Sequence, residues 1–267
     1  MILFIVVLFI VTGLVLRHLY LWKPSSMDDF FTEKPTVFAH RGYIYNHPEN
    51  TLSSFIEAVK KGAKALEVDV VKTKDNKIIC SHNYNLETET DLFGNISKLE
   101  YSFIKRANTA HRLKKHKKEY IPELIDVLNS IPDEIKINIE IKTRSLSDIL
   151  IARDVVKTIK NNNINHKVLV SSFNPLVLLY IKFLDNKIRT GFLYDDPKHL
   201  YIKNIIHPDC LHPEESIVNE SLVKHCTERG LHINVWTTNN KPAADWLTNL
   251  GVNGIITDNP KIFSKHA

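Results

Sequence analysis

From Thr36 onward, short apolar runs rich in β-branched residues alternate with longer stretches of helical periodicity, and this alternation constrains the fold most. The candidate strands are residues 36–42, 65–73, 136–142, 168–173, 188–194, 209–213, 232–239 and 254–258. The helical stretches between them are residues 51–61, 123–130, 147–161, 176–184, 220–229 and 242–250. This pattern predicts the α/β class and a TIM (β/α)8 barrel, a fold that needs about 250 residues. A doubly wound open sheet is the alternative, but no GxGxxG loop supports it.

The length of 267 residues accommodates one such barrel and a short additional segment. The formal net charge of +5 is too small to indicate a nucleic-acid partner. The three cysteines, Cys80, Cys210 and Cys226, are widely spaced in apolar surroundings, so we expect buried thiols rather than disulfides. Residues 83–120 interrupt the alternation after a further strand at residues 78–82, and we interpret them as an insertion on the barrel rim.

The first residues, Met1–Leu16, carry no charge, and residues 18–22 extend the apolar stretch to the roughly 20 residues that a membrane helix requires. A secretory signal peptide is a competing interpretation, but no Lys or Arg precedes the run and no small-residue cleavage site follows it. A buried core helix is a further alternative. We therefore predict an uncleaved transmembrane anchor over residues 1–23, with a lipid bilayer as its partner.

The basic residues near this span set its expected orientation. Arg17 and Lys23 both follow the apolar run, which by the positive-inside tendency places the rest of the chain in the cytoplasm. Residues 24–35 are expected to form a short polar tether, and residues 36–267 the barrel domain.

Carboxylates occupy one face of two candidate strands. Because successive strand residues point to opposite faces, Glu67 and Asp69 share one face of their strand, and Asn138 and Glu140 share one face of the next. In a barrel these faces point inward near the mouth, where three carboxylates repel unless a cation neutralises them. Oxygen ligands favour a hard ion, so we predict one divalent cation, Mg²⁺ or Ca²⁺. The alternatives are solvated edge positions, or pairing with Lys142 and Lys72.

Two of the 13 histidines end apolar strands and therefore belong at the same mouth. These are His40, followed by Arg41 and Gly42, and His82. A pair of imidazoles can give and take a proton in one reaction, and a guanidinium such as that of Arg41 suits a phosphate. Together with a metal, these groups indicate phosphoryl transfer on a diester.

The motifs that carry this chemistry resemble those of the glycerophosphodiester phosphodiesterase family. The likeness covers Thr36 to Pro260 in the order and spacing of the family. The matching blocks are Ala39-His40-Arg41-Gly42, Pro48-Glu49-Asn50-Thr51, Glu67-Val68-Asp69-Val70, Ser81-His82, Ile121-Pro122, Ile139-Glu140-Ile141-Lys142, residues 170–175, residues 235–239 and residues 254–260.

The resemblance implies a TIM barrel with a small insertion after the second histidine motif, and a role for each matching residue. Glu67, Asp69 and Glu140 would bind the cation, and His40 and His82 would be the general acid and base. Arg41 and Lys142 would hold the phosphate, with Glu49 supporting the site. Trp236 and Phe173 would line the pocket, although both fit a barrel core equally well. Asn239 and Asp258 are expected to be structural rather than catalytic.

Three positions depart from the family pattern. Asn83 stands where Asp is usual, Thr88 where Arg is common, and Ile125 where an acidic residue often follows Ile-Pro. Asn83 brings no negative charge, so we expect His82 to keep its orientation with a lowered pKa. These changes lie on the insertion side of the pocket and therefore concern substrate choice more than catalysis.

The resemblance and the residues together predict a metal-dependent phosphodiesterase of lipid metabolism that hydrolyses glycerophosphodiesters to glycerol 3-phosphate and an alcohol. One alternative is a lysophospholipase D that acts on membrane lysophospholipids. Another is a catalytically inactive, membrane-bound barrel.

Overall fold

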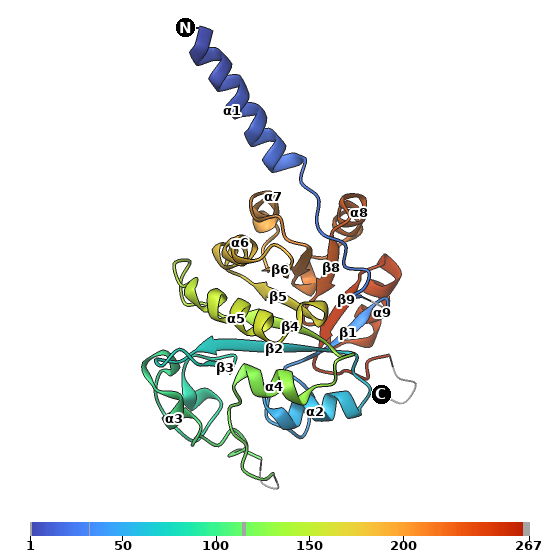
Figure 1. The fold of residues 1–267 in the computed structure, drawn as a ribbon. Helices are drawn as coiled ribbons and strands as arrows, with labels where there is room; N and C mark the ends of the chain where they lie inside the picture. Colours follow the sequence, from blue (N-terminus) through green and yellow to red (C-terminus); the bar gives the residue numbers. More distant parts are fainter. Residues whose placement is uncertain (1, 32, 114–115, 264–267) are drawn as a thin grey trace.

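Eight parallel strands form a closed barrel in the computed structural model, which describes residues 2–31, 33–113 and 116–263 (Figure 1). The barrel closes because β1 pairs with both β2 and β9, which confirms the predicted TIM barrel and excludes the open sheet. A ninth strand, β3 (Ile78–Cys80), runs antiparallel to the end of β2. The barrel strands, in their order around the barrel, are β1 (Thr36–His40), β2 (Ala65–Lys72), β4 (Lys136–Ile141), β5 (Val168–Ser172), β6 (Arg189–Tyr194), β7 (Cys210–Pro213), β8 (His232–Val235) and β9 (Gly254–Thr257).

Helices flank the barrel and lie close to the stretches predicted from the sequence. They are α2 (Leu52–Lys60), α4 (Leu124–Ser130), α5 (Leu150–Asn161), α6 (Pro175–Leu184), α7 (Lys203–Ile206), α8 (Glu220–Arg229) and α9 (Lys241–Leu250). Short 3-10 helices occupy residues 165–167, 197–202 and 215–217 of the connections. The N-cap of α2 is Thr51, and Asn50 before it lies in the left-handed region with φ 55°.

The core follows the alternation of the strands. On β2, the apolar face of Leu66, Val68 and Val70 is fully buried in the main hydrophobic cluster beneath the helices. The opposite face, with Glu67 and Asp69, therefore points into the barrel. This alternation is what carries charged side chains into the interior of the molecule.

The amino-terminal segment before β1 contributes a second cluster. Met27, Phe30 and Phe31 are buried, with exposures of 0%, 0% and 2%, and they pack against the β1 and β9 residues Phe38 and Ile256. Residues 24–35 are thus more than a polar spacer, since they supply aromatic side chains to the barrel core.

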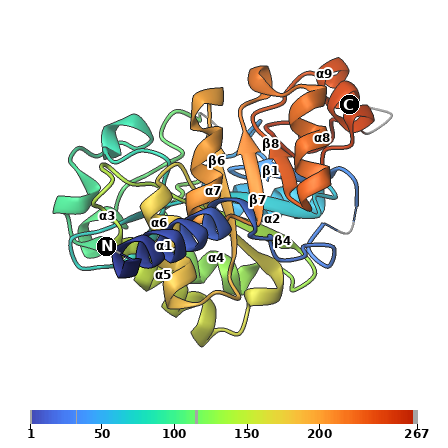
Figure 2. The same ribbon diagram turned by 90° about the horizontal axis from the view of Figure 1, so that it is seen from above.

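The chain between β3 and α4 forms a separate small unit. It contains short helices at Leu86–Thr88, Ile96–Lys98 and α3 (Tyr101–Ile104), which enclose their own apolar cluster with Val71 and Ile79. Both views place it on the side of the barrel away from α8 and α9 (Figure 1, Figure 2). Residues 114–115 within this segment lie outside the described residues.

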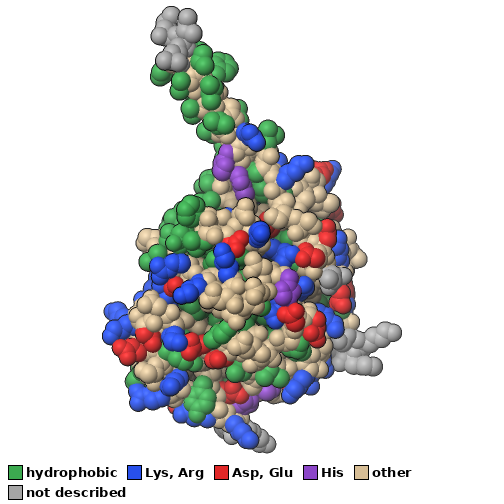
Figure 3. All heavy atoms as spheres, in the orientation of Figure 1, with side chains coloured by type: hydrophobic (Ala, Val, Ile, Leu, Met, Phe, Trp, Pro, Cys, Tyr) green, Lys and Arg blue, Asp and Glu red, His purple; other side chains and the backbone are tan. Residues whose placement is uncertain are grey.

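The first helix, α1 (Ile2–Tyr20), projects from the barrel and is coated with apolar side chains (Figure 3). Among the described residues, no helix is long and apolar enough to cross a membrane. Arg17 and His18 occupy the last turn of α1, and the uncharged residues 2–16 rise only about 22 Å, against about 30 Å for a hydrocarbon core. The predicted transmembrane anchor over residues 1–23 and the membrane location that depends on it are therefore wrong, and the predicted bilayer partner is not supported. Met1 lies outside the described residues.

Candidate active site

Three carboxylates from two neighbouring strands converge inside the barrel. The parallel register places Asp69 of β2 beside Glu140 of β4, and Glu67 lies two residues before Asp69 on the same face. Oxygen atoms of all three side chains lie within 4.8 Å of one another. Their exposures are 1% for Glu67, 0% for Asp69 and 7% for Glu140, so water does not screen their repulsion.

This crowding suits a cation. Burial, followed by repulsion from Asp69 and Glu140, raises the pKa of Glu67 well above its usual range. Burial also raises the pKa of Glu140. Glu67 Oε1 is buried without a hydrogen-bond partner among the described residues, which leaves it free to bind an ion. The three-carboxylate set therefore fits the hard divalent cation that the sequence predicts.

Two basic side chains partly balance the carboxylates. Lys142 Nζ lies 3.0 Å from Asp69 Oδ1 and also contacts Glu140 Oε1, and Arg41 Nε lies 3.1 Å from Asp69 Oδ2. Burial alone would raise the pKa of Asp69, but Lys142 and Arg41 outweigh it and hold that pKa below its usual range. Lys72, the other partner considered from the sequence, instead lies 3.5 Å from Asp154 outside this cluster.

Asn50 holds Asp69 in place, a role that the sequence did not indicate. Its amide Nδ2 donates to Asp69 Oδ2 at 2.9 Å, and its Oδ1 accepts from the Asp69 backbone N–H at 3.1 Å. The turn that positions Asn50 also contains Arg41 and Gly42, with φ values of 57° and 93°. A Cβ on Gly42 would lie 2.7 Å from the backbone of Ser54, so this turn requires glycine.

His40 ends β1 and is oriented by a carboxylate from the last strand. Its Nδ1 lies 2.7 Å from Asp258 Oδ1, and Asn239 Nδ2 donates to Asp258 Oδ2 at 2.6 Å. With Nδ1 engaged, Nε2 is the ring atom available for proton transfer. Asp258 and Asn239, which the sequence led us to expect as structural residues, form a hydrogen-bonded chain to a candidate catalytic histidine.

His82 is half-buried after β3, and burial lowers its pKa to about 4. Glu89 accepts hydrogen bonds from both chain neighbours of His82, which are Ser81 and Asn83. Glu89 Oε1 accepts from the Asn83 N–H at 3.1 Å and from Asn83 Nδ2 at 2.7 Å, while Oε2 accepts from Ser81 Oγ at 3.2 Å. Glu89 thus brings a carboxyl group to Asn83, whose own side chain carries none.

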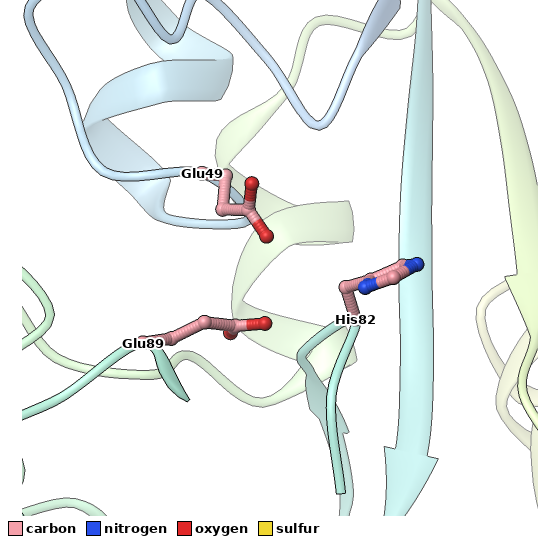
Figure 4. A group of neighbouring side chains, drawn as sticks. All are labelled: Glu49, His82 and Glu89. Carbon is pink, nitrogen blue, oxygen red and sulfur yellow. The ribbon is translucent and has the colours of Figure 1, made fainter. Parts of the chain in front are cut away.

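Glu49 approaches the same group from the turn after β1, and Figure 4 shows Glu49, His82 and Glu89 converging. Glu49 accepts from Arg41 Nη1 at 3.0 and 3.2 Å. Burial, followed by repulsion from Glu49, raises the pKa of Glu89 to about 7. These contacts place Glu49 behind Arg41 rather than in the three-carboxylate set.

The two aromatic candidates lie together. Phe173 and Trp236 form an edge-to-face pair with centroids 5.3 Å apart, and Trp236 Nε1 donates to the His212 carbonyl at 2.7 Å. Phe173 is 43% exposed, so it is available to a ligand. Trp236 packs partly against the aromatic cluster of the barrel core.

Two cavities are lined by basic side chains that contact carboxylates of the cluster. One of about 360 Å³ is lined by Arg41 and Glu49 together with insertion residues such as Glu89 and Arg112. Another of about 250 Å³ is lined by Lys142. Buried carboxylates, two basic side chains and two imidazoles between such spaces define a phosphoric diester hydrolase.

The comparison with known proteins identifies the family. The model of the glycerophosphoryl diester phosphodiesterase family matches residues 40–262, and the chain belongs to this family. It is 32% identical over 234 residues to a glycerophosphodiester phosphodiesterase of Caldanaerobacter subterraneus, covering 85% of this chain and 96% of that protein. It is 25% identical to a human lysophospholipase D, over 83% of this chain and 82% of that protein.

A solved structure supports the same assignment. A phosphodiesterase of Oleispira antarctica, determined in complex with the product sn-glycerol-3-phosphate, superposes with a TM-score of 0.79 at 26% identity. The match covers 88% of this chain and 97% of that one.

Proposed function

We propose that this chain is a metal-dependent enzyme that hydrolyses glycerophosphodiesters to glycerol 3-phosphate and an alcohol. The observation that carries the proposal is the convergence of Glu67, Asp69 and Glu140 with Arg41 and Lys142 beside the two histidines. The names of the relatives and the glycerol 3-phosphate bound in the Oleispira structure support this substrate class. Such diesters arise when phospholipids lose their acyl chains, which connects the reaction to lipid metabolism.

Glu67, Asp69 and Glu140 would hold one divalent cation, Mg²⁺ or Ca²⁺. When bound, the cation supplies positive charge to the phosphate and to the charge that develops on its oxygens. The three carboxylates carry three negative charges and Arg41 and Lys142 carry two positive ones, so a divalent ion gives the cluster a net charge of about +1. A singly charged phosphodiester is complementary to that charge.

The histidines would divide the proton transfers. One imidazole removes a proton from the nucleophile as its oxygen attacks phosphorus, and the other gives a proton to the alcohol oxygen as the P–O bond breaks. The nucleophile is water, or the neighbouring glycerol hydroxyl by way of a cyclic phosphate that water then opens. Asp258 fixes the ring of His40 through Nδ1, and Glu89 fixes the segment that carries His82.

The substitution Glu67→Gln tests the metal site. We expect the purified variant to lose at least about 100-fold in divalent-dependent release of choline from glycerophosphocholine. Calorimetry should show that it no longer binds Mg²⁺ or Ca²⁺ as the wild type does. The control is Glu134→Gln, because Glu134 is exposed, precedes β4 and is not part of the three-carboxylate set. Wild-type turnover by Glu67→Gln would show that the metal assignment is incorrect.

A lysophospholipid is the second candidate substrate. The likeness to a human lysophospholipase D over most of this chain favours testing it. Turnover of lysophosphatidylcholine and glycerophosphocholine should be compared in detergent, with and without chelator. No hydrolysis of the lyso-lipid would eliminate this candidate. An inactive barrel is disfavoured, because all three carboxylates and both histidines are present.

A further inference from the structure

The cavity of about 250 Å³ beside Lys142 is unusually rich in basic side chains. It lies between the end of β2, the segment that follows β4 and the small unit that follows β3. Four basic residues line it: Lys72, Lys74, Lys142 and Arg144. One acidic residue, Asp148, is part of the same lining. Lys142 is shared with the candidate active site, so a single ligand can touch both.

The basic side chains are unequally neutralised. Lys142 contacts Asp69 and Glu140, and Lys72 lies 3.5 Å from Asp154. Lys74 lies 3.8 Å from Glu100, but both of these side chains are about 60% exposed, and such pairs contribute little.

Arg144 is the least compensated of the four. Among the described residues it forms no ion pair with a carboxylate within 4.0 Å, and its guanidinium carbon lies 4.5 Å from the centroid of the Tyr84 ring. Stacking of this kind fixes the plane of a guanidinium while leaving its N–H groups available for an anion. A positive charge without a carboxylate partner therefore lies at the wall of the cavity.

Tyr84 provides a neutral donor at the same wall. Its hydroxyl oxygen is buried and forms no hydrogen bond with any described residue. Tyr84 also lines the cavity, and Arg144 lies over its ring. A phenol O–H can donate to a phosphate or carboxylate oxygen, so this orphaned hydroxyl points to a ligand with an acceptor.

The geometry points to a subsite for a second anionic group of the substrate, a phosphate or a carboxylate, held by Arg144, Lys74 and the Tyr84 hydroxyl. This inference rests on the proposed function and sharpens it. The scissile phosphate lies on the Arg41 side of Lys142, and the second anion lies on the Arg144 side. The enzyme then prefers diesters with an anionic headgroup over diesters with a cationic one such as choline.

The cavity beside Arg41 differs in charge. It contains Glu49 and Glu89 as well as Arg41 and Arg112, so acidic and basic groups are balanced there. We therefore expect substrates to be selected by the charge of the headgroup at the cavity beside Lys142, and not at the cavity beside Arg41.

A matched pair of diesters tests the subsite. Glycerophosphoglycerol has an uncharged headgroup, and 1,3-bis(glycerophospho)glycerol carries a second phosphodiester on the same glycerol. Binding of each to the full chain is measured by calorimetry with Mg²⁺ or Ca²⁺ present, and every protein compared, the wild-type subsite included, carries His40→Gln so that turnover is slow. At about 50 mM salt we expect the wild type to bind the bis-diester about tenfold more tightly, beyond the twofold that two equivalent phosphodiesters give statistically.

Arg144→Gln should lower this ratio about threefold to fivefold, and Tyr84→Phe should lower it while keeping every charge. Raising the salt to about 300 mM should also reduce the ratio. Lys224→Gln is the matched control, because it removes one exposed positive charge on α8 and should leave the ratio unchanged.

The outcomes separate the two proposals. If the wild type binds the two diesters with equal affinity once the twofold statistical factor is removed, the subsite proposal is overturned, whatever the turnover. The subsite is also overturned if Arg144→Gln and Lys224→Gln give the same ratio. Failure of the wild type to hydrolyse either diester with Mg²⁺ or Ca²⁺, while the difference in binding persists, overturns the proposed function and not the anion subsite.

Discussion

Replacing Phe30 by Ala should destabilise the whole barrel, although Phe30 precedes the first strand. Its side chain is 0% exposed and lies in the aromatic cluster at β1, with ring centroids 5.3 Å from Phe31 and 6.2 Å from Phe38. The substitution leaves a cavity because strands on several sides fix the surrounding atoms. Such Phe→Ala changes cost about 3–5 kcal/mol, and two lost aromatic contacts place this one in the upper part of that range.

The change in stability is measured by urea unfolding of the full chain, followed by circular dichroism. For a chain of this size, a loss of about 4 kcal/mol corresponds to a fall in Tm of about 8–16 °C. Phe183→Ala is the control, because Phe183 is 83% exposed and its loss should change the unfolding free energy by no more than about 0.5 kcal/mol. If Phe30→Ala unfolds at the same urea concentration as the wild type, residues 24–35 are only a spacer and the packing argument is incorrect.

Three further substitutions test the site and its supports. Asp258→Asn should lower kcat on a glycerophosphodiester about 100-fold with KM nearly unchanged, because His40 loses the carboxylate that orients it; an unchanged kcat would assign Asp258 to structure alone. Burial lowers the pKa of His212 to about 3, so its stabilising effect is complete above pH about 6.5 and is lost as the pH falls, when the unfolded chain alone takes up the proton. Between pH 7.5 and 5, His212→Asn should therefore lose about 2 kcal/mol less unfolding free energy than the wild type in urea titrations, and identical pH profiles would contradict this. Gly42→Ala should destabilise the chain by more than about 2 kcal/mol in the same assay, because Ser54 blocks the added Cβ; retention of wild-type stability would show that the turn relaxes.

The barrel and the three-carboxylate set could be predicted because both depend on local sequence. Strict alternation places Glu67 and Asp69 on one strand face, and parallel pairing brings Glu140 beside them without any knowledge of distant contacts. The positions of His40 and His82 followed in the same way, since each comes at or just after the end of an apolar run.

The supporting residues could not be predicted in this way. Asp258 lies 218 residues from His40, and no local pattern indicates that closure of β9 onto β1 brings them together. Asn50 directly precedes a predicted helical stretch, and its contact with Asp69 depends on a left-handed turn. The buried phenylalanines before β1 lie outside any helix or strand, so no periodicity in the sequence indicates that they are buried.

The N-terminal prediction failed for a different reason. Hydropathy measures composition along the chain, and residues 1–23 are apolar enough to suggest a span. Spanning requires length as well, and the helix places Arg17 and His18 in its last turn. The uncharged part of the helix, residues 2–16, is consequently shorter than the stretch of residues 1–23 on which the prediction was based.

The contacts of Glu89 link two positions of the chain in evolution. Asn83 stands where the resemblance to the family leads us to expect Asp, and a carboxyl group reaches it from six residues further along the chain. Placing Asp at position 83 would bring a second carboxylate against Glu89, while losing Glu89 would leave Ser81 and Asn83 without the carboxylate that accepts their hydrogen bonds. Each single step between the two arrangements thus passes through a doubled or an absent charge. Positions 83 and 89 are expected to change as a pair, and exchanging only one of them between relatives should produce a poorer enzyme than either parent.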